Sequence, residues 1–209
     1  TLVGKSYGII RNCRNTGDVE LNITGDVTSN VYMGCIMGYS NIQTQSSLGG
    51  EYVYCMKDCQ NDGDFLFTVG GYACNVFLGG VASGTSCGAL SDTSANKGTF
   101  KNCVNTGTVQ YIVKNGGSLE DNAGAAGKND AYINMGGVVG YCEGHLESCV
   151  NRGPVKMQGP TLESVWALKR GAVGGVSGFV LFSVTDCKNY GTVSAKSTWV
   201  NGTEKTAGA

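Results

Sequence analysis

The sequence predicts an all-β fold, a parallel β-helix (β-solenoid) in which short strands of successive coils stack in register. Two observations lead to this prediction. A unit built from cysteine, asparagine and glycine occurs five times, and glycine accounts for 34 of the 209 residues against only 2 prolines. Self-similarity at a fixed period is typical of solenoids, in which each unit buries its apolar side against its neighbours.

The repeated unit has a fixed internal spacing. An apolar residue is followed three positions later by cysteine, and then at steps of two by asparagine, glycine and a valine or phenylalanine. The five copies cover residues 10–19, 56–65, 100–109, 146–155 and 184–193. Their cysteines, at positions 13, 59, 103, 149 and 187, are 46, 44, 46 and 38 residues apart. One copy in each coil predicts about five coils.

A second element, rich in glycine and apolar residues, precedes each copy, at residues 2–4, 34–38, 79–83, 136–140 and 174–178. In three copies its first apolar residue lies 11 positions before the cysteine, as Leu2 does before Cys13. Before Cys59 and Cys103 this distance is 23 and 22 residues. We therefore expect inserted loops, which we place at residues 39–54, 84–98, 114–134 and 160–171.

The residue types favour strands over helical repeats. The shared positions hold β-branched and aromatic residues between single glycines, and each glycine costs a helix interior about 1 kcal/mol. We expect these glycines at corners, where positive φ and close stacking are required. One short helix is predicted at residues 161–170, capped by Thr161 and ended by Gly171. A right-handed coil is expected, because parallel crossovers prefer that hand.

We interpret residues 1–209 as a single β-solenoid domain taken from a longer repeat-containing protein. The chain opens in mid-unit at Leu2. Gly208 follows Cys187 at an offset of 21 residues, the same offset at which Gly34 follows Cys13.

Charge and hydropathy argue against nucleic acid and membrane as partners. The 15 Lys and Arg residues against 16 Asp and Glu leave no electrostatic footprint for nucleic acid. No stretch approaches the roughly 20 apolar residues that span a bilayer, so no membrane insertion is expected within this fragment.

The repeat resembles a known family. Gly136-Gly-Val-Val-Gly-Tyr141, then an apolar residue shortly before cysteine, then Asn-x-Gly-x-Val, is similar to the GLUG-type repeats of bacterial cell-surface proteins. Such repeats also occur in the non-catalytic N-terminal region of some immunoglobulin A-specific metalloproteases. The resemblance covers most of the chain and implies a parallel β-helix on an exported protein, with no catalytic residue to carry over. Cys35 and Ser83 depart from the pattern by replacing repeat glycines.

The repeated polar positions are predicted to be structural. An asparagine at the same corner of every coil can bond to the next one and to turn backbone, and the cysteines should stack about 4.8 Å apart as buried thiols. Side-by-side Cβ vectors disfavour disulfides between coils, so any disulfides are expected among Cys35, Cys55, Cys74, Cys87 and Cys142. The ladder positions are Asn15, Asn61, Asn105, Asn151 and Asn189, with Cys13, Cys59, Cys103, Cys149 and Cys187.

No pattern predicts a catalytic, metal or cofactor site. His145, interpreted as an exposed turn residue, is the only histidine, which excludes a histidine-rich zinc site. The acidic turn formed by Asp58, Asp62 and Asp64 lacks the glutamate that closes a calcium loop.

The expected function is that of a non-enzymatic extracellular or cell-surface module, acting as an adhesin or spacer. Its inserted loops would contact a glycan or a host surface protein, because loops positioned by a rigid scaffold often carry binding. Aromatic side chains are the expected contacts, since such residues dominate many binding surfaces. The candidates are Tyr52, Tyr54, Tyr132 and Trp166.

Two alternatives remain open. A polysaccharide lyase or glycoside hydrolase needs paired acids in a groove, for which the candidate pairs are Asp18 with Asp64 and Glu143 with Glu147. Only fold analogy supports that reading. An ice-binding solenoid needs a flat row of regularly spaced threonines, which Asp62, Arg152 and Tyr190 interrupt here.

Overall fold

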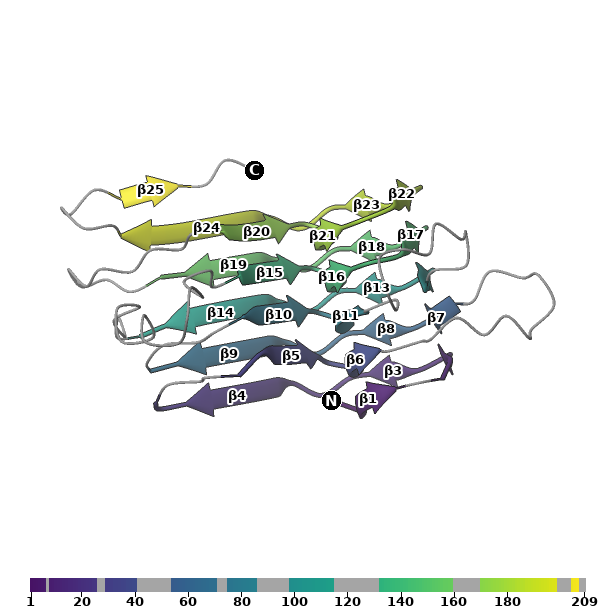
Figure 1. The fold of residues 1–209 in the computed structure, drawn as a ribbon, viewed down its shortest axis with the longest axis horizontal. Coiled ribbons are helices and arrows are strands. Elements are labelled where there is room, and N and C mark those ends of the chain that lie inside the picture. The colour runs from purple at the N-terminus through teal and green to yellow at the C-terminus, as the bar shows by residue number, and fades with distance from the viewer. Residues whose placement is uncertain are drawn as a thin grey trace, which may run out of the picture.

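The computed structural model describes residues 1–6, 8–25, 29–40, 54–70, 75–85, 98–114, 132–159, 170–198 and 204–206. Every helix or strand assigned within these residues is a β-strand, and the strands form five sheets that are parallel apart from β25. The predicted all-β parallel β-helix is therefore confirmed. Figure 1 shows its coils stacked from the purple N-terminal end to the yellow C-terminal end. No helix in the described ranges is long and apolar enough to cross a membrane.

Each of the first four coils contributes one strand to each sheet. The first coil contains β1 (Val3–Ser6), β2 (Ile10–Arg11), β3 (Arg14–Asn15), β4 (Val19–Ile23) and β5 (Val31–Gly34). The second contains β6 (Met37–Ser40), β7 (Tyr54–Lys57), β8 (Gln60–Asn61), β9 (Phe65–Val69) and β10 (Val76–Gly79). The third contains β11 (Ala82–Thr85), β12 (Thr99–Lys101), β13 (Val104–Asn105), β14 (Val109–Val113) and β15 (Tyr132–Gly136).

The last two coils follow the same order. The fourth contains β16 (Val139–Cys142), β17 (His145–Glu147), β18 (Val150–Asn151), β19 (Val155–Gln158) and β20 (Arg170–Gly174). The fifth contains β21 (Ser177–Val180), β22 (Ser183–Thr185), β23 (Lys188–Asn189) and β24 (Val193–Thr198). Strand β25 (Glu204–Thr206) then pairs antiparallel with β24.

The sheets take the name of their first-coil strand. The β1 sheet has the order β1-β6-β11-β16-β21, and the β2 sheet the order β2-β7-β12-β17-β22. The β3 sheet joins β3-β8-β13-β18-β23, the β4 sheet joins β4-β9-β14-β19-β24-β25, and the β5 sheet joins β5-β10-β15-β20. Equivalent repeat residues lie opposite one another, as Gly79 does between Gly34 and Gly136.

Three of the five corners have a constant length. Two residues separate each β2-sheet strand from the following strand, as residues 58 and 59 do between β7 and β8. Three residues, such as 62–64, lead from the β3 sheet to the β4 sheet, and two, such as 80–81, lead from the β5 sheet to the β1 sheet. These corners carry the repeat motifs, so their length is fixed by contacts between coils.

The other two corners vary in length. Between the β1 and β2 sheets the connection ranges from residues 143–144 to residues 86–98. Between the β4 and β5 sheets it ranges from residues 70–75 to residues 114–131. All four predicted insertions fall at these two corners, although their outermost residues belong to the flanking strands. These strands stay paired, with one shift of register between Thr99 and Phe100 where β12 pairs with β7.

The interior contains two clusters of buried side chains. One lies between the β1 and β2 sheets and includes Met56, Phe100 and Leu146, the apolar residues that precede the cysteines. The other lies between the β4 and β5 sheets, where the rings of Phe67 and Tyr111 stack with centroids 5.2 Å apart. Side chains of β14 alternate between buried and half-buried, as a strand with one inward face requires.

Two sequence predictions need correction. The left-handed backbone was expected at glycines, but it occurs at Asn12, Asp58, Asn102, Ser148 and Asp186, each with φ between 52° and 55°. Each precedes a ladder cysteine, and asparagine and aspartate tolerate this region because their short side chains can bond locally. The predicted helix at 161–170 lies outside the described residues except for its last residue, Arg170. That residue begins β20, because it pairs with Tyr132.

Candidate functional site

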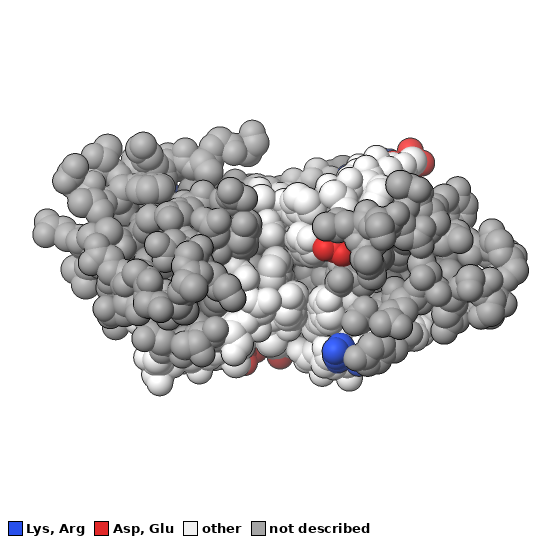
Figure 2. Space-filling view, in the orientation of Figure 1, with Lys and Arg blue, Asp and Glu red and all other residues white. Residues whose placement is uncertain are grey.

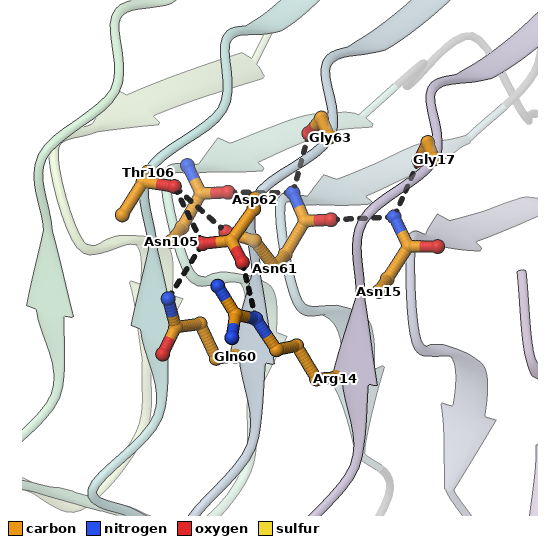
Figure 3. A network of polar contacts seen from close by, with 9 residues as sticks. All are labelled: Arg14, Asn15, Gly17, Gln60, Asn61, Asp62, Gly63, Asn105 and Thr106. Atoms are coloured by element: carbon orange, nitrogen blue, oxygen red, sulfur yellow. Dashed lines mark hydrogen bonds and ion pairs between the residues drawn. The ribbon is translucent and has the colours of Figure 1, made fainter.

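A continuous ladder of asparagine amides runs along the corner between the β3 and β4 sheets. Each Nδ2 donates to the Oδ1 of the next asparagine, over 2.8 Å from Asn61 to Asn105 and 2.9 Å from Asn105 to Asn151. The same Nδ2 donates to the carbonyl oxygen two residues later, as Asn61 does to Gly63 over 2.7 Å (Figure 3). Asn15 and Asn189 continue the ladder at its two ends. In the first four asparagines both amide hydrogens are used in this way, so these side chains connect the coils.

Glycines of the second repeat element close the coil around this ladder. A Cβ built on Gly80 would lie 2.4 Å from the side chain of Asn105, and one built on Gly137 would lie 2.2 Å from that of Asn151. A side chain at Gly80 or Gly137 would overlap the asparagine, whereas in the preceding coil the equivalent position holds Cys35. The two repeat elements are therefore in contact across each coil, which explains why they occur together along the chain.

The five repeat cysteines form a second ladder. Each Sγ donates to the carbonyl oxygen two residues earlier, over 3.3 Å in Cys59 and 3.5 Å in Cys149. All five are free thiols, as is Cys35, while Cys74 and Cys87 lie outside the described residues. Burial raises the pKa of the Cys59 thiol, which keeps it protonated. The three central ladder thiols thus act as small buried groups in the core, and Cys13 and Cys187 at the two ends are partly buried.

Asp62 joins three coils outside the asparagine ladder (Figure 3). Its carboxylate accepts hydrogen bonds from Gln60 Nε2 over 2.5 Å, from Arg14 Nε over 2.5 Å and from Thr106 Oγ1 over 2.9 Å. The hydrogen bond from Gln60 is the largest cause of a lowered pKa at Asp62, and those from Arg14 and Thr106 add to it. This residue is a clamp between coils and is not available as a general acid at neutral pH.

The predicted ligand-binding aromatics are distributed differently from expectation. Tyr52 and Trp166 lie outside the described residues. Tyr54 and Tyr132, expected in inserted loops, are the first residues of β7 and β15, because they pair with Thr99 and Arg170 of the neighbouring coils.

Tyr54 is surrounded by cations. The Nζ atoms of Lys57 and Lys101 lie 5.6 Å and 5.3 Å from the centre of its ring, and Lys101 Nζ also donates to its hydroxyl over 3.3 Å. Lys101 in turn forms an ion pair with Glu147 at 3.0 Å. The side chain of Tyr54 is therefore held against the β2 sheet by neighbouring coils.

A row of aromatic rings that the sequence analysis missed joins the β5 and β1 sheets. The row, called the aromatic track below, runs in the order Tyr39, Tyr32, Phe77, Tyr141, Phe179. Successive ring centroids are 4.5, 4.8, 5.3 and 5.0 Å apart. Tyr32 and Phe77 belong to the β5 sheet, and the other three residues to the β1 sheet. The rings thus form one contact chain parallel to the stacking axis.

At Gly84 the row of rings passes from the β1 sheet to the β5 sheet. Gly84 occupies the track position of the β1 sheet between Tyr39 and Tyr141, where a Cβ would lie 2.5 Å from the carbonyl oxygen of Tyr141. Phe77 of the adjacent sheet bridges the gap by contacting Tyr32 and Tyr141. The track is therefore continuous although no single strand position is aromatic in every coil.

Polar groups border the track. Tyr141 donates from its hydroxyl to Glu143 Oε1 over 2.7 Å, and burial together with this carboxylate raises its pKa. The Nδ2 of Asn30 donates to the Tyr32 hydroxyl over 3.3 Å, and the Nδ2 of Asn75 donates to Asn30 Oδ1 over 2.9 Å. Hydroxyl, amide and carboxylate groups thus lie beside aromatic rings on one face of the solenoid.

A weak sequence signal for the track exists. Tyr32 and Tyr39 lie seven positions apart and flank the glycine-rich element, and the same spacing separates Phe77 from Gly84 and Asn134 from Tyr141. Aligning the repeats does not predict the track, because the aromatic residue lies in the β5 sheet in some repeats and in the β1 sheet in others.

The stacked acids have structural partners. Asp18 Oδ1 accepts from the backbone N–H of Asp64 over 2.8 Å, and Asp64 Oδ1 accepts from that of Thr108 over 2.7 Å. Both acids border a groove of about 400 Å³ on the β4 sheet, together with Glu20 and Lys156. In the described ranges no group of three His, Cys, Asp or Glu residues is placed to hold a metal ion.

His145 was expected in an exposed turn but is the first residue of β17. It pairs with Thr99 and Ser183 of the adjacent coils, and its Nδ1 lies 2.7 Å from the hydroxyl of Ser183. Its backbone is held in the sheet by parallel pairing with β12 on one side and β22 on the other.

Comparison with known proteins found no matching family, no similar curated protein and no similar solved structure.

Proposed function

We propose that this chain is a non-catalytic module of a secreted or cell-surface protein, which acts as an adhesive spacer. The observation that carries the proposal is the restriction of all long insertions to two corners of an otherwise constant coil. Such a fold holds variable segments at fixed spacing on a rigid body, which is how loops on a scaffold provide binding. The resemblance of the repeat to GLUG-type repeats supports the proposed location outside the cell.

The interior also supports a mechanical role. Amides, thiols and glycines at equivalent positions contact one another from coil to coil, and successive coils are about 4.8 Å apart. The number of coils therefore sets the length of the body. A spacer of this kind places its insertions at a defined distance from whatever it is attached to.

A binding screen tests the adhesive role. The wild-type chain, a loop variant combining Tyr52→Ala and Trp166→Ala, and a control variant Tyr190→Ala are applied to a glycan array and a panel of host surface proteins. Tyr190 is a suitable control because it is an aromatic residue 61% exposed on a constant corner. A ligand lost in the loop variant and kept in the control supports the proposal.

Two results would contradict the proposal. The absence of any ligand for the wild-type chain would exclude the adhesive role and leave only a spacer. Release of reducing ends or unsaturated sugars from a polysaccharide panel would show that the module is an enzyme.

A further inference from the structure

The aromatic track has the dimensions of a site for a chain-like ligand. Four of the five coils contribute rings to it, and the third coil contributes none. It extends from β6 to β21, which are three coil spacings of about 4.8 Å, or about 14 Å, apart. A folded protein partner needs about 800 Å² on each side of a stable interface. A row one side chain wide is better matched by an extended polymer lying parallel to the stacking axis.

The track is partly accessible to such a ligand. Phe179 is 38% exposed, the three tyrosines are half-buried and Phe77 is buried. The rings of Tyr32 and Phe77 stack face to face, with their planes 10° apart. A ligand would therefore contact the ring edges and the tyrosine hydroxyls. Such edges offer apolar carbon and polar oxygen side by side.

The surroundings of the track favour an uncharged ligand. Lys5 lies at one end, with its Nζ 5.9 Å from the centre of the Tyr39 ring, and Glu143 lies beside Tyr141. These opposite charges do not form a basic row that an acidic polymer would require. In Figure 2 the described surface between the grey segments is predominantly white, with only isolated charged groups.

We propose that the aromatic track, Tyr32, Tyr39, Phe77, Tyr141 and Phe179, binds a neutral polysaccharide strand along the stacking axis. Sugar rings present apolar C–H surfaces that pack against the aromatic edges, and hydroxyl groups that bond to the Asn30 and Asn75 amides and the Glu143 carboxylate. This inference rests on the proposed binding function, and it places the ligand on the face between the two corners that carry the insertions.

Affinity electrophoresis tests the proposal. Native gels contain hydroxyethylcellulose, galactomannan, xylan or soluble β-glucan as neutral probes, or polygalacturonate as an acidic probe. We expect at least one neutral polymer to retard the wild-type chain. A track variant combining Tyr39→Ala and Phe179→Ala should bind that polymer at least about tenfold more weakly, which corresponds to about 1.4 kcal/mol. Tyr190→Ala should bind as the wild type does.

Two further measurements keep the test decisive. Circular dichroism and thermal unfolding establish that the track variant is folded, and Tyr39→Phe, which keeps the ring, should retain most of the binding if the variant with alanine proves unstable. Absence of retardation in every neutral gel overturns the inference, as does retardation by polygalacturonate alone. A ligand from the array that is lost in the loop variant but kept in the track variant supports the proposed function and overturns the track as its site.

Discussion

A Cβ built on Gly107 would lie 2.0 Å from the carbonyl oxygen of Gly63, so these two glycines touch backbone to backbone in neighbouring coils. Gly63 stands in the same relation to Gly17, and Gly153 to Gly107. None of these glycines needs a positive φ. They are glycines because a neighbouring coil occupies the space that a side chain would take.

Gly107→Ala is therefore expected to destabilise the protein by about 3 kcal/mol, because a methyl group at this position forces the coils apart. Gly17→Ala is the matched control, since a Cβ at Gly17 has no other atom within 4 Å. It should change the free energy of unfolding by less than about 0.5 kcal/mol. Urea unfolding monitored by circular dichroism measures both, and equal effects of the two substitutions would contradict the stacking argument.

Asn105→Ala should cost about 3 kcal/mol, because it leaves an amide donor of Asn61 and the Oδ1 of Asn151 without partners in a fully buried ladder. Asn15→Ala, at the exposed end of the same ladder, should cost about 1 kcal/mol. The free energies of unfolding from urea titration provide the comparison. A smaller loss at Asn105 than at Asn15 would show that the amides do not act as a buried ladder.

Cys35→Gly should make the protein less sensitive to alkaline pH. Cys35 occupies the place of Gly80 and Gly137, and burial raises the pKa of its thiol to about 12. An unfolded cysteine has a pKa of about 8.5, so the unfolded chain releases this proton first. The protonated Cys35 thiol therefore stabilises the folded state fully below about pH 8.5, and this contribution is lost as the pH rises towards 12. The wild type should therefore lose about 1.4 kcal/mol for each pH unit more than Cys35→Gly over this window.

Unfolding titrations at several pH values between 8 and 11 measure this difference. The remaining cysteines contribute equally to both proteins, so the difference isolates Cys35. Parallel stability profiles for the wild type and Cys35→Gly would refute the assignment.

Asp62→Asn should reduce stability by up to about 1 kcal/mol at pH 7, a small value because the side chain of Arg14 is 64% exposed. The pKa of Asp62 is lowered in the folded protein, first by the hydrogen bond from Gln60 and then by Arg14 and Thr106. Its stabilisation is present above the unfolded pKa of about 3.9 and is lost as the pH falls through the folded pKa. The two proteins should therefore converge as the pH falls below the folded pKa of Asp62.

The same unfolding assay in 1 M NaCl should shrink the difference at pH 7, because salt screens surface charges. Asp186→Asn is the control, since Asp186 has the left-handed backbone that asparagine also tolerates. If Asp186→Asn lowers the free energy of unfolding as much as Asp62→Asn does, the Asp62 carboxylate does not stabilise the contact between coils.

The coil and its register could be predicted from the sequence because identical residues occupy stacked positions. Asn61 and Asn105 are 44 residues apart in the chain yet directly opposite in the sheet, and counting from cysteine to cysteine reveals this. The glycine-rich element could be aligned in the same way, which placed Gly34, Gly79 and Gly136 in register.

The features that were missed depend on contacts between residues that do not repeat. Tyr32 and Phe77 stack on each other, but the next residue in their row is Asn134, and the track continues through Tyr141 of another sheet. Alignment of repeats shows no such crossing. The left-handed corners were missed because glycine was assumed to supply them, although Asn, Asp or Ser precedes every ladder cysteine, as at Asn12 and Asp58.

At the two corners of variable length, the number of residues in a coil is independent of the length of the solenoid along its stacking axis. A connection of residues 143–144 and one of residues 86–98 lead into neighbouring strands of the same sheet, with the pairing unchanged. Added sequence at these corners therefore leaves the stacking of the coils unchanged, while added repeats lengthen the solenoid. Foreign peptides grafted at these corners would be displayed at distances that are multiples of the spacing between coils.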